Sequence, residues 1–160
     1  MQIESYRTRL EEFEQNLNRE LYRYRSGAKN RLEIVSLYAD YSDLFCTESI
    51  REVECAVKSE PFASRRKSLE KILQCLIDQY LDFHSAALQE EIAWLEANQT
   101  LSWEGRELHL SQVPACLRAE SDALRRRKLN QRYGKALEES GELKLRIVAQ
   151  LRATAVSLGF

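Results

Sequence analysis

Apolar residues recur at every third or fourth position through most of the chain, which is the pattern of amphipathic α-helices. The first segment is the most regular, and its apolar stripe comprises Ile3, Tyr6, Leu10, Phe13, Leu17, Leu21 and Tyr24. Gly27 follows, and a glycine in the left-handed conformation commonly ends a helix. Tyr22 lies about 200° from Tyr24 around the helix, so the two rings cannot form one stacking surface. We interpret the basic residues around them as a helix C-terminus, not as a groove for nucleic acid.

The same spacing predicts a second helix over residues 32–45 and a third, short helix capped by Thr47. Pro61 separates the third helix from a long apolar-patterned segment, residues 64–98. No glycine or proline interrupts that segment, so it predicts one long central helix.

The period changes from helical spacing to strict alternation between Thr100 and Leu110. Leu101 and Trp103 alternate before Gly105, and Leu108 alternates with Leu110 after it. Two alternating segments joined by a turn that contains glycine predict a β-hairpin. An isolated hairpin is marginally stable in water, so we expect this one to pack against helices or a partner.

Helical spacing returns after the hairpin and continues almost to the C-terminus. Pro114 opens a short helical turn, Ser121 and Asp122 mark the start of another helix, and Gly141 is a candidate kink or end. No internal repeat is evident. These elements predict an all-α, multi-helix bundle with one long central helix and a single β-hairpin near residues 100–110, in one domain over residues 1–160.

Composition excludes several classes of protein. Five glycines and two prolines in 160 residues supply too few turns for an all-β fold. The net charge of −1 gives no overall field toward nucleic acid or an anionic membrane, and no apolar run approaches the ~20 residues of a membrane span. The charged N-terminus does not resemble a signal peptide, and the cysteines (Cys46, Cys55, Cys75 and Cys116) form no Cys-x-x-Cys pair. We predict a cytoplasmic protein with reduced cysteines.

Candidate catalytic chemistry is sparse. The two histidines, His84 and His109, form no His-Glu-x-x-His motif, and neither follows a glutamate at the spacing of a di-iron bundle, because those positions are Leu81 and Arg106. A Cys-His nucleophile pair has no local signature, and no glycine-rich phosphate loop is present. We therefore predict no catalytic residue, no cofactor-binding residue and no metal ligand, and expect that the chain is not an enzyme by itself.

The densest basic run extends from Arg125 to Lys128. Consecutive residues spread around the whole circumference of a helix, so these four cannot all face one groove. With Glu120 and Asp122 close in sequence, we interpret the run as exposed decoration of a helix and predict no nucleic-acid partner.

One stretch resembles a known family. Residues 17–45 combine a tyrosine-rich helix ending at a glycine, then Leu-x-Ile and Tyr-x-x-Tyr-x-x-Leu-Phe, carried by Gly27, Leu32, Ile34, Tyr38, Tyr41, Leu44 and Phe45. This pattern resembles the N-terminal helical region of oligoendopeptidase F and thimet-oligopeptidase-like zinc metallopeptidases. The resemblance implies a non-catalytic domain that forms one wall of a peptide channel. The family's His-Glu-x-x-His would follow residue 160, so no catalytic residue is carried over.

Two functions remain open on the sequence. If the chain is the N-terminal domain of a longer peptidase, its partner is the catalytic domain, and an exposed apolar face predicts self-association when it is alone. The alternative is a stand-alone helical scaffold or adaptor that acts through protein–protein contacts. Both require apolar stripes with charged flanks, so composition does not separate them.

Overall fold

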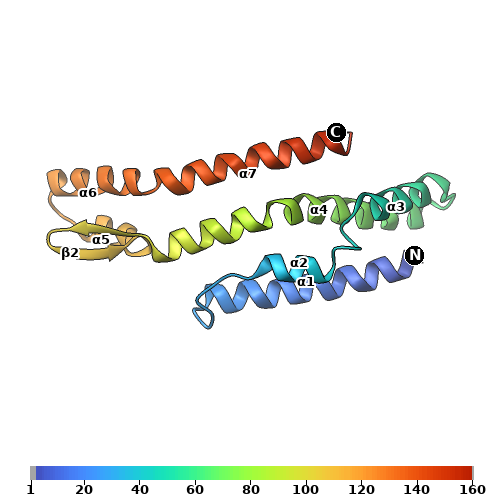
Figure 1. Ribbon diagram of the computed structural model, residues 1–160, viewed down its shortest axis with the longest axis horizontal. Helices are drawn as coiled ribbons and strands as arrows, with labels where there is room; N and C mark the ends of the chain where they lie inside the picture. The colour runs from blue at the N-terminus through green and yellow to red at the C-terminus, as the bar shows by residue number, and fades with distance from the viewer. Residues whose placement is uncertain (1–2, 160) are drawn as a thin grey trace. The chain divides into compact units, whose positions relative to one another are not determined.

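The computed structural model describes residues 3–159, with the side chains of Ile3 and Glu139 left aside. In that range the chain forms seven α-helices, one 3-10 helix and a two-stranded sheet (Figure 1). Their bounds are α1 Ile3–Arg25, α2 Ile34–Asp40, α3 Thr47–Ser59, α4 Ala63–Asn98, β1 Thr100–Trp103, β2 Arg106–His109, η1 Leu110–Gln112, α5 Val113–Ala119, α6 Ala123–Ala136 and α7 Glu138–Ser157. The predicted helical bundle with a long helix and one hairpin is confirmed.

The chain divides into two compact units. Unit 1 comprises Met1–Ala87 and Ala149–Phe160, and unit 2 comprises Leu88–Val148. Helices α4 and α7 each contribute residues to both units. The prediction that residues 1–160 act as a single domain stays a prediction.

Three aromatic rings form the centre of unit 1. The ring centroid of Phe13 on α1 lies 4.9 Å from that of Tyr38 on α2 and 4.6 Å from that of Phe45. The Tyr38 hydroxyl donates a hydrogen bond of 2.8 Å to Gln79 on α4, and burial raises the pKa of that hydroxyl. Aromatic packing and one satisfied polar group thus hold α1, α2 and α4 together.

The loop after α1 confirms the predicted helix end. Helix α1 stops at Arg25, and Gly27 adopts a φ of 76° in the left-handed region. Lys29 in this loop lies 2.6 Å from Glu20 and 2.7 Å from Glu33, so one ammonium group joins α1 to the residue before α2. Tyr22 is 72% exposed, as its position off the apolar stripe predicts.

Two predictions for the next elements need correction. The second helix is shorter than residues 32–45, because the backbone tightens after Asp40 into bonds such as Tyr41 N–H to Tyr38 C=O. That tightening turns Leu44 and Phe45 into the core. Thr47 is the first residue of α3 and does not cap it; the extended Cys46 occupies the cap position without a side-chain cap bond.

Gly141 does not end the last helical region. Its N–H donates to the Leu137 carbonyl at 2.9 Å, so α7 continues through it. The break lies earlier, at Leu137, whose N–H is shared between the carbonyls of Tyr133 and Gly134. A glycine inside a helix costs only about 1 kcal/mol, which the rest of a 20-residue helix outweighs.

The predicted hairpin lies in unit 2 and has a two-residue turn. Strand β1 pairs antiparallel with β2 from Thr100 opposite His109 to Trp103 opposite Arg106. Glu104 and Gly105 form the turn with φ values of 52° and 78°, the positive values that match the twist of a hairpin. The hairpin packs on α5 and α6 through a buried cluster of Leu101, Leu110, Val113 and Leu129.

Unit 1 and unit 2 each contain a copy of one structural motif, so the expectation of no internal repeat is wrong. We call residues 50–69 the first repeat and residues 110–129 the second repeat. Every position of the first has the same degree of burial (buried, half-buried or exposed) as the position 60 residues later. Six positions carry the same residue: Val53/Val113, Glu60/Glu120, Ala63/Ala123, Arg65/Arg125, Arg66/Arg126 and Leu69/Leu129.

The turn between the two helices of each repeat has the same geometry. Glu60 has φ −77° and ψ 115°, and Glu120 has φ −75° and ψ 114°. Each glutamate side chain accepts a 3.0 Å hydrogen bond from the backbone N–H two residues later. Each glutamate carbonyl accepts a 2.9 Å hydrogen bond from an arginine six residues later, Arg66 or Arg126. The arginines thus satisfy a carbonyl that the end of a helix leaves without an intrahelical partner.

Candidate functional site

The two histidines lie among different neighbours. His84 is exposed on α4, with its ring centroid 4.5 Å from that of Tyr80. His109 ends β2 and caps η1, where its backbone N–H donates to the Gln112 side chain. Within residues 3–159, no three side chains of His, Cys, Asp or Glu lie close enough together to hold a metal ion.

No disulfide joins the four cysteines, and their surroundings differ. Cys75 on α4 donates from Sγ to a carboxylate oxygen of Glu14 on α1 at 3.4 Å. Burial, with a smaller contribution from this contact, raises the pKa of the Cys75 thiol to about 12. Cys55 is exposed on α3, and Cys116 packs against the buried cluster under the hairpin.

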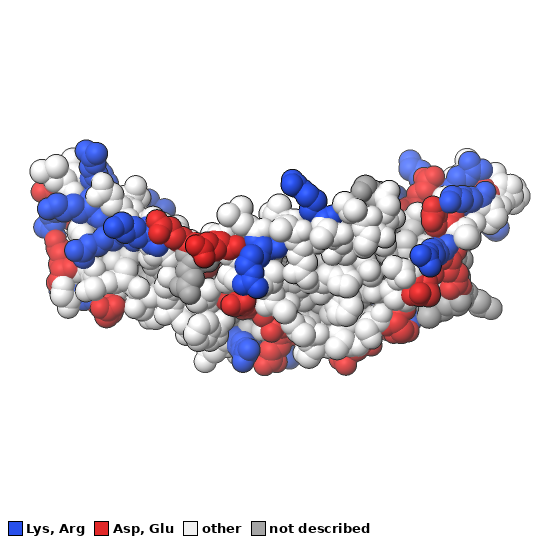
Figure 2. All heavy atoms as spheres, turned by 45° about the horizontal axis from the view of Figure 1, so that its top comes forward, with Lys and Arg blue, Asp and Glu red and all other residues white. Residues whose placement is uncertain are grey.

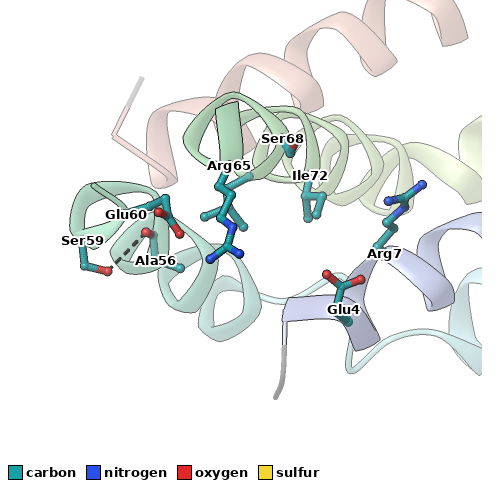
Figure 3. A pocket seen from close by; sticks show the side chains of 9 residues that line it. Glu4, Arg7, Ala56, Ser59, Glu60, Arg65, Ser68 and Ile72 are labelled. Atoms are coloured by element: carbon teal, nitrogen blue, oxygen red, sulfur yellow. Dashed lines mark hydrogen bonds between the residues drawn. The ribbon is translucent and has the colours of Figure 1, made fainter. Parts of the chain in front are cut away.

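A cleft of about 580 Å³ lies in unit 1 beside the first repeat. Its walls come from the start of α1, the end of α3 and the start of α4 (Figure 3). Leu69 and Ile72 give it an apolar floor, and the charged groups around it are Glu4, Arg7, Glu60 and Arg65. An apolar floor with a few charged groups around it is the composition of a binding site.

Arg65 is the basic group that this cleft leaves without a counter-ion among the described residues. Figure 3 shows its side chain extending from α4 into the space that the three helices surround. Its guanidinium lies 5.6 Å from the centroid of the Phe62 ring, and it forms no ion pair with any residue that the structure describes. Arg7, by contrast, lies 2.9 Å from Glu11 on its own helix.

A cleft of about 430 Å³ lies in unit 2 at the corresponding place beside the second repeat. Here Arg125 pairs with Glu104 of the hairpin turn and lies 3.2 Å from Glu120. Arg132 donates to the Ser102 carbonyl at 2.8 Å and lies 5.6 Å from the centroid of the Trp103 ring. The tip of the hairpin therefore supplies the counter-ion that the first cleft lacks.

The basic run at the start of α6 is exposed, as predicted, but it is more than solvated decoration. Arg125 bonds the hairpin turn, and Arg126 bonds the Glu120 carbonyl. Over α6 and the start of α7, the face drawn in Figure 2 shows basic side chains next to acidic ones. This surface therefore has mixed charge.

No protein-family model, curated protein or solved structure matches the chain. None of the helices in residues 3–159 combines the length and apolar character that crossing a membrane requires.

Sequence reasoning missed both the repeat and the clefts. A signal for them is present as Glu-x-x-Ala-x-Arg-Arg-x-x-Leu, which begins at Glu60 and again at Glu120. The segments before each copy differ, because a helix precedes one and a hairpin precedes the other. The similarity thus covers only 20 residues at a time. The run from Arg125 to Lys128 was interpreted by its charge, and its match to residues 65–68 was not recognised.

Proposed function

We propose that this chain is a non-catalytic helical scaffold that binds a segment of a partner protein in the cleft beside the first repeat. The observation that supports it is the combination of an open cleft, an apolar floor at Leu69 and Ile72, and an Arg65 without a counter-ion among the described residues. Peptide-binding grooves combine apolar contacts for affinity with a few charged groups for orientation.

A random peptide library displayed on phage tests this proposal. We expect panning against the full chain to enrich peptides whose binding falls about tenfold or more in an Ile72→Lys variant, because a charge would replace an apolar contact on the cleft floor. The matched control is Leu124→Lys, which places the same charge at a 71% exposed position of α6.

Thermal unfolding and circular dichroism establish that both variants keep the helical fold. Enriched peptides that bind Ile72→Lys as well as they bind the wild-type chain would contradict the proposed cleft. A library that yields no binder at all would contradict the scaffold function.

The second candidate is the wall of a peptide channel in an oligoendopeptidase-like zinc peptidase. It is favoured by the packing of the residues that carry that resemblance: Gly27 has the positive φ of a helix end, and Tyr38, Leu44 and Phe45 are buried. The test is the sequence of the gene beyond codon 160. A continued reading frame with His-Glu-x-x-His supports this candidate, and a stop codon contradicts it.

A further inference from the structure

The two clefts are built from the same positions of the two repeats. Five lining positions correspond at an interval of 60 residues: Ala56/Cys116, Ser59/Ala119, Glu60/Glu120, Arg65/Arg125 and Leu69/Leu129. Because the turn geometry and hydrogen bonds of the repeats also agree, the second cleft indicates what the first one is shaped to hold.

The second cleft contains an acidic turn. Glu104 sits at the tip of the hairpin with a positive φ and pairs with Arg125, and Trp103 precedes it in the sequence. The turn therefore presents an aromatic ring followed by a carboxylate to the repeat. This arrangement combines apolar contact with one charge-assisted hydrogen bond.

The first cleft has the receiving groups without such a turn. Arg65 corresponds to Arg125, but its guanidinium rests near the Phe62 ring. Glu60 corresponds to Glu120, and one of its carboxylate oxygens accepts the Phe62 N–H as Glu120 accepts that of Asp122. Helix α1 contributes Glu4 and Arg7 where the second cleft has the hairpin. Within the described residues Glu4 forms no ion pair with Arg65, and Arg7 pairs with Glu11.

We infer that the cleft beside the first repeat binds an acidic turn of a partner protein, in which an aromatic residue is followed by a glutamate or aspartate that pairs with Arg65. This inference rests on the proposed scaffold function and specifies its ligand. Glu4 and Glu60 surround the same cleft, so a single carboxylate is favoured over a phosphate, whose higher charge they would repel.

The probe is a cyclic peptide with the sequence of residues 100–109, titrated into the full chain and followed by NMR chemical shifts. The second cleft is occupied by the tethered hairpin, whose effective concentration exceeds that of added peptide. We expect shifts at Ser59, Arg65 and Ser68. A peptide with Gln in place of the glutamate at position 104 should bind about fivefold more weakly, the upper range for an exposed ion pair.

Two variants of the chain complete a double-mutant cycle. Arg65→Gln should lower the affinity for the native peptide about as much as the Gln substitution in the peptide lowers its affinity for the wild-type chain. The Gln peptide should bind Arg65→Gln and the wild-type chain equally well. Arg125→Gln, the matched control in the second repeat, should leave shifts at the first cleft unchanged. Equal binding of the two peptides, or Arg65-dependent binding of tripolyphosphate in place of the peptide, would overturn the inference.

The outcome is separable from that of the proposed function. If library peptides bind in an Ile72-dependent manner but the acidic turn does not bind, the scaffold function stands and the acidic ligand is wrong. If neither binds, both proposals fail.

Discussion

Arg65 and Arg125 occupy corresponding positions in two repeats with the same turn, yet their guanidinium groups have different neighbours. In the second repeat the hairpin turn provides Glu104, and Glu120 lies on the other side. In the first repeat the corresponding cleft borders α1, and Arg65 lies against an aromatic ring. The turn thus has the same backbone geometry whether the hairpin or α1 borders the cleft. The bordering element determines whether the arginine pairs within the chain, as Arg125 does, or is open to a partner, as Arg65 is.

The largest difference between variants should come from the buried leucines that anchor the motif. Leu129 is 1% exposed and Leu69 is 8% exposed. We expect Leu129→Ala and Leu69→Ala each to lower the free energy of unfolding by about 2–5 kcal/mol, with the more enclosed Leu129 toward the upper end. Urea unfolding followed by circular dichroism measures this, with the exposed Leu124→Ala as control. A loss below about 1 kcal/mol at either leucine would mean that the repeat is not a packed unit.

A smaller difference should separate the two arginines. Arg125→Gln removes pairs with Glu104 and Glu120, and we expect it to cost up to about 1 kcal/mol because the guanidinium is half exposed. Arg65→Gln removes no ion pair within the described residues and should stay within about 0.5 kcal/mol of the wild type. Hydrogen exchange of the β1 and β2 amides should rise in Arg125→Gln. Equal losses at both arginines would show that the internal pair contributes nothing.

Lowering the pH should weaken the start of α6, which Asp122 caps, and not the start of α4, where Phe62 stands at the matching position. The N–H groups of Arg125 and Leu124 donate to Asp122 and hold the pKa of its carboxyl below the ordinary 3.8. Because this pKa is depressed in the folded state, its stabilising effect is present above about pH 4 and is lost as the pH falls through the folded value. Asn caps a helix as well as Asp but does not titrate.

Asp122→Asn should therefore unfold with a shallower dependence on pH between 5 and 2 than the wild type. Other carboxyls with lowered pKa values, such as Asp43 beside Arg9, titrate in both proteins and cancel in the difference. Identical pH profiles of the melting temperature would show that the cap does not contribute.

A small effect of opposite sign is expected at the matching position of the first repeat. Phe62 corresponds to Asp122 and offers no side-chain acceptor to the first turn of α4. Phe62→Asp adds a cap but removes the contact with Arg65, so we expect a gain below about 1 kcal/mol. Differential scanning calorimetry should detect a slight rise in melting temperature. A fall would mean that the aromatic contact is worth more than the cap.

Local signals predicted most of the fold. The unbroken apolar spacing of residues 64–98 predicted α4, and Gly105 between alternating segments predicted the hairpin. The failures arose where tertiary packing outweighs local preference. Leu44 and Phe45 continue the helical spacing in the sequence, but α2 ends at Asp40 and both side chains are buried in the core from the segment that follows it. Gly141 reads as a breaker, yet the hydrogen-bond ladder of α7 continues through it.

The candidate site could not be predicted in the same way. Arg65 and Arg125 stand in basic runs that look alike, and their difference depends on whether a distant residue such as Glu104 reaches them. That is a property of the chain path, which hydrophobic spacing does not determine. Composition and spacing indicated that the run from Arg125 to Lys128 was exposed, and the three-dimensional arrangement decided which of the two arginines was left unpaired among the described residues.

The thiol of Cys75 makes the contact between α1 and α4 observable in the unmodified protein. Burial raises its pKa from an ordinary 9.0 to about 12, so little of it is thiolate and alkylation is slow while the helices stay packed. Cys55, which is exposed on α3, provides a reference thiol on the same chain. The rate at which iodoacetamide labels Cys75 therefore reports how often α1 and α4 separate. It measures local opening without an engineered label.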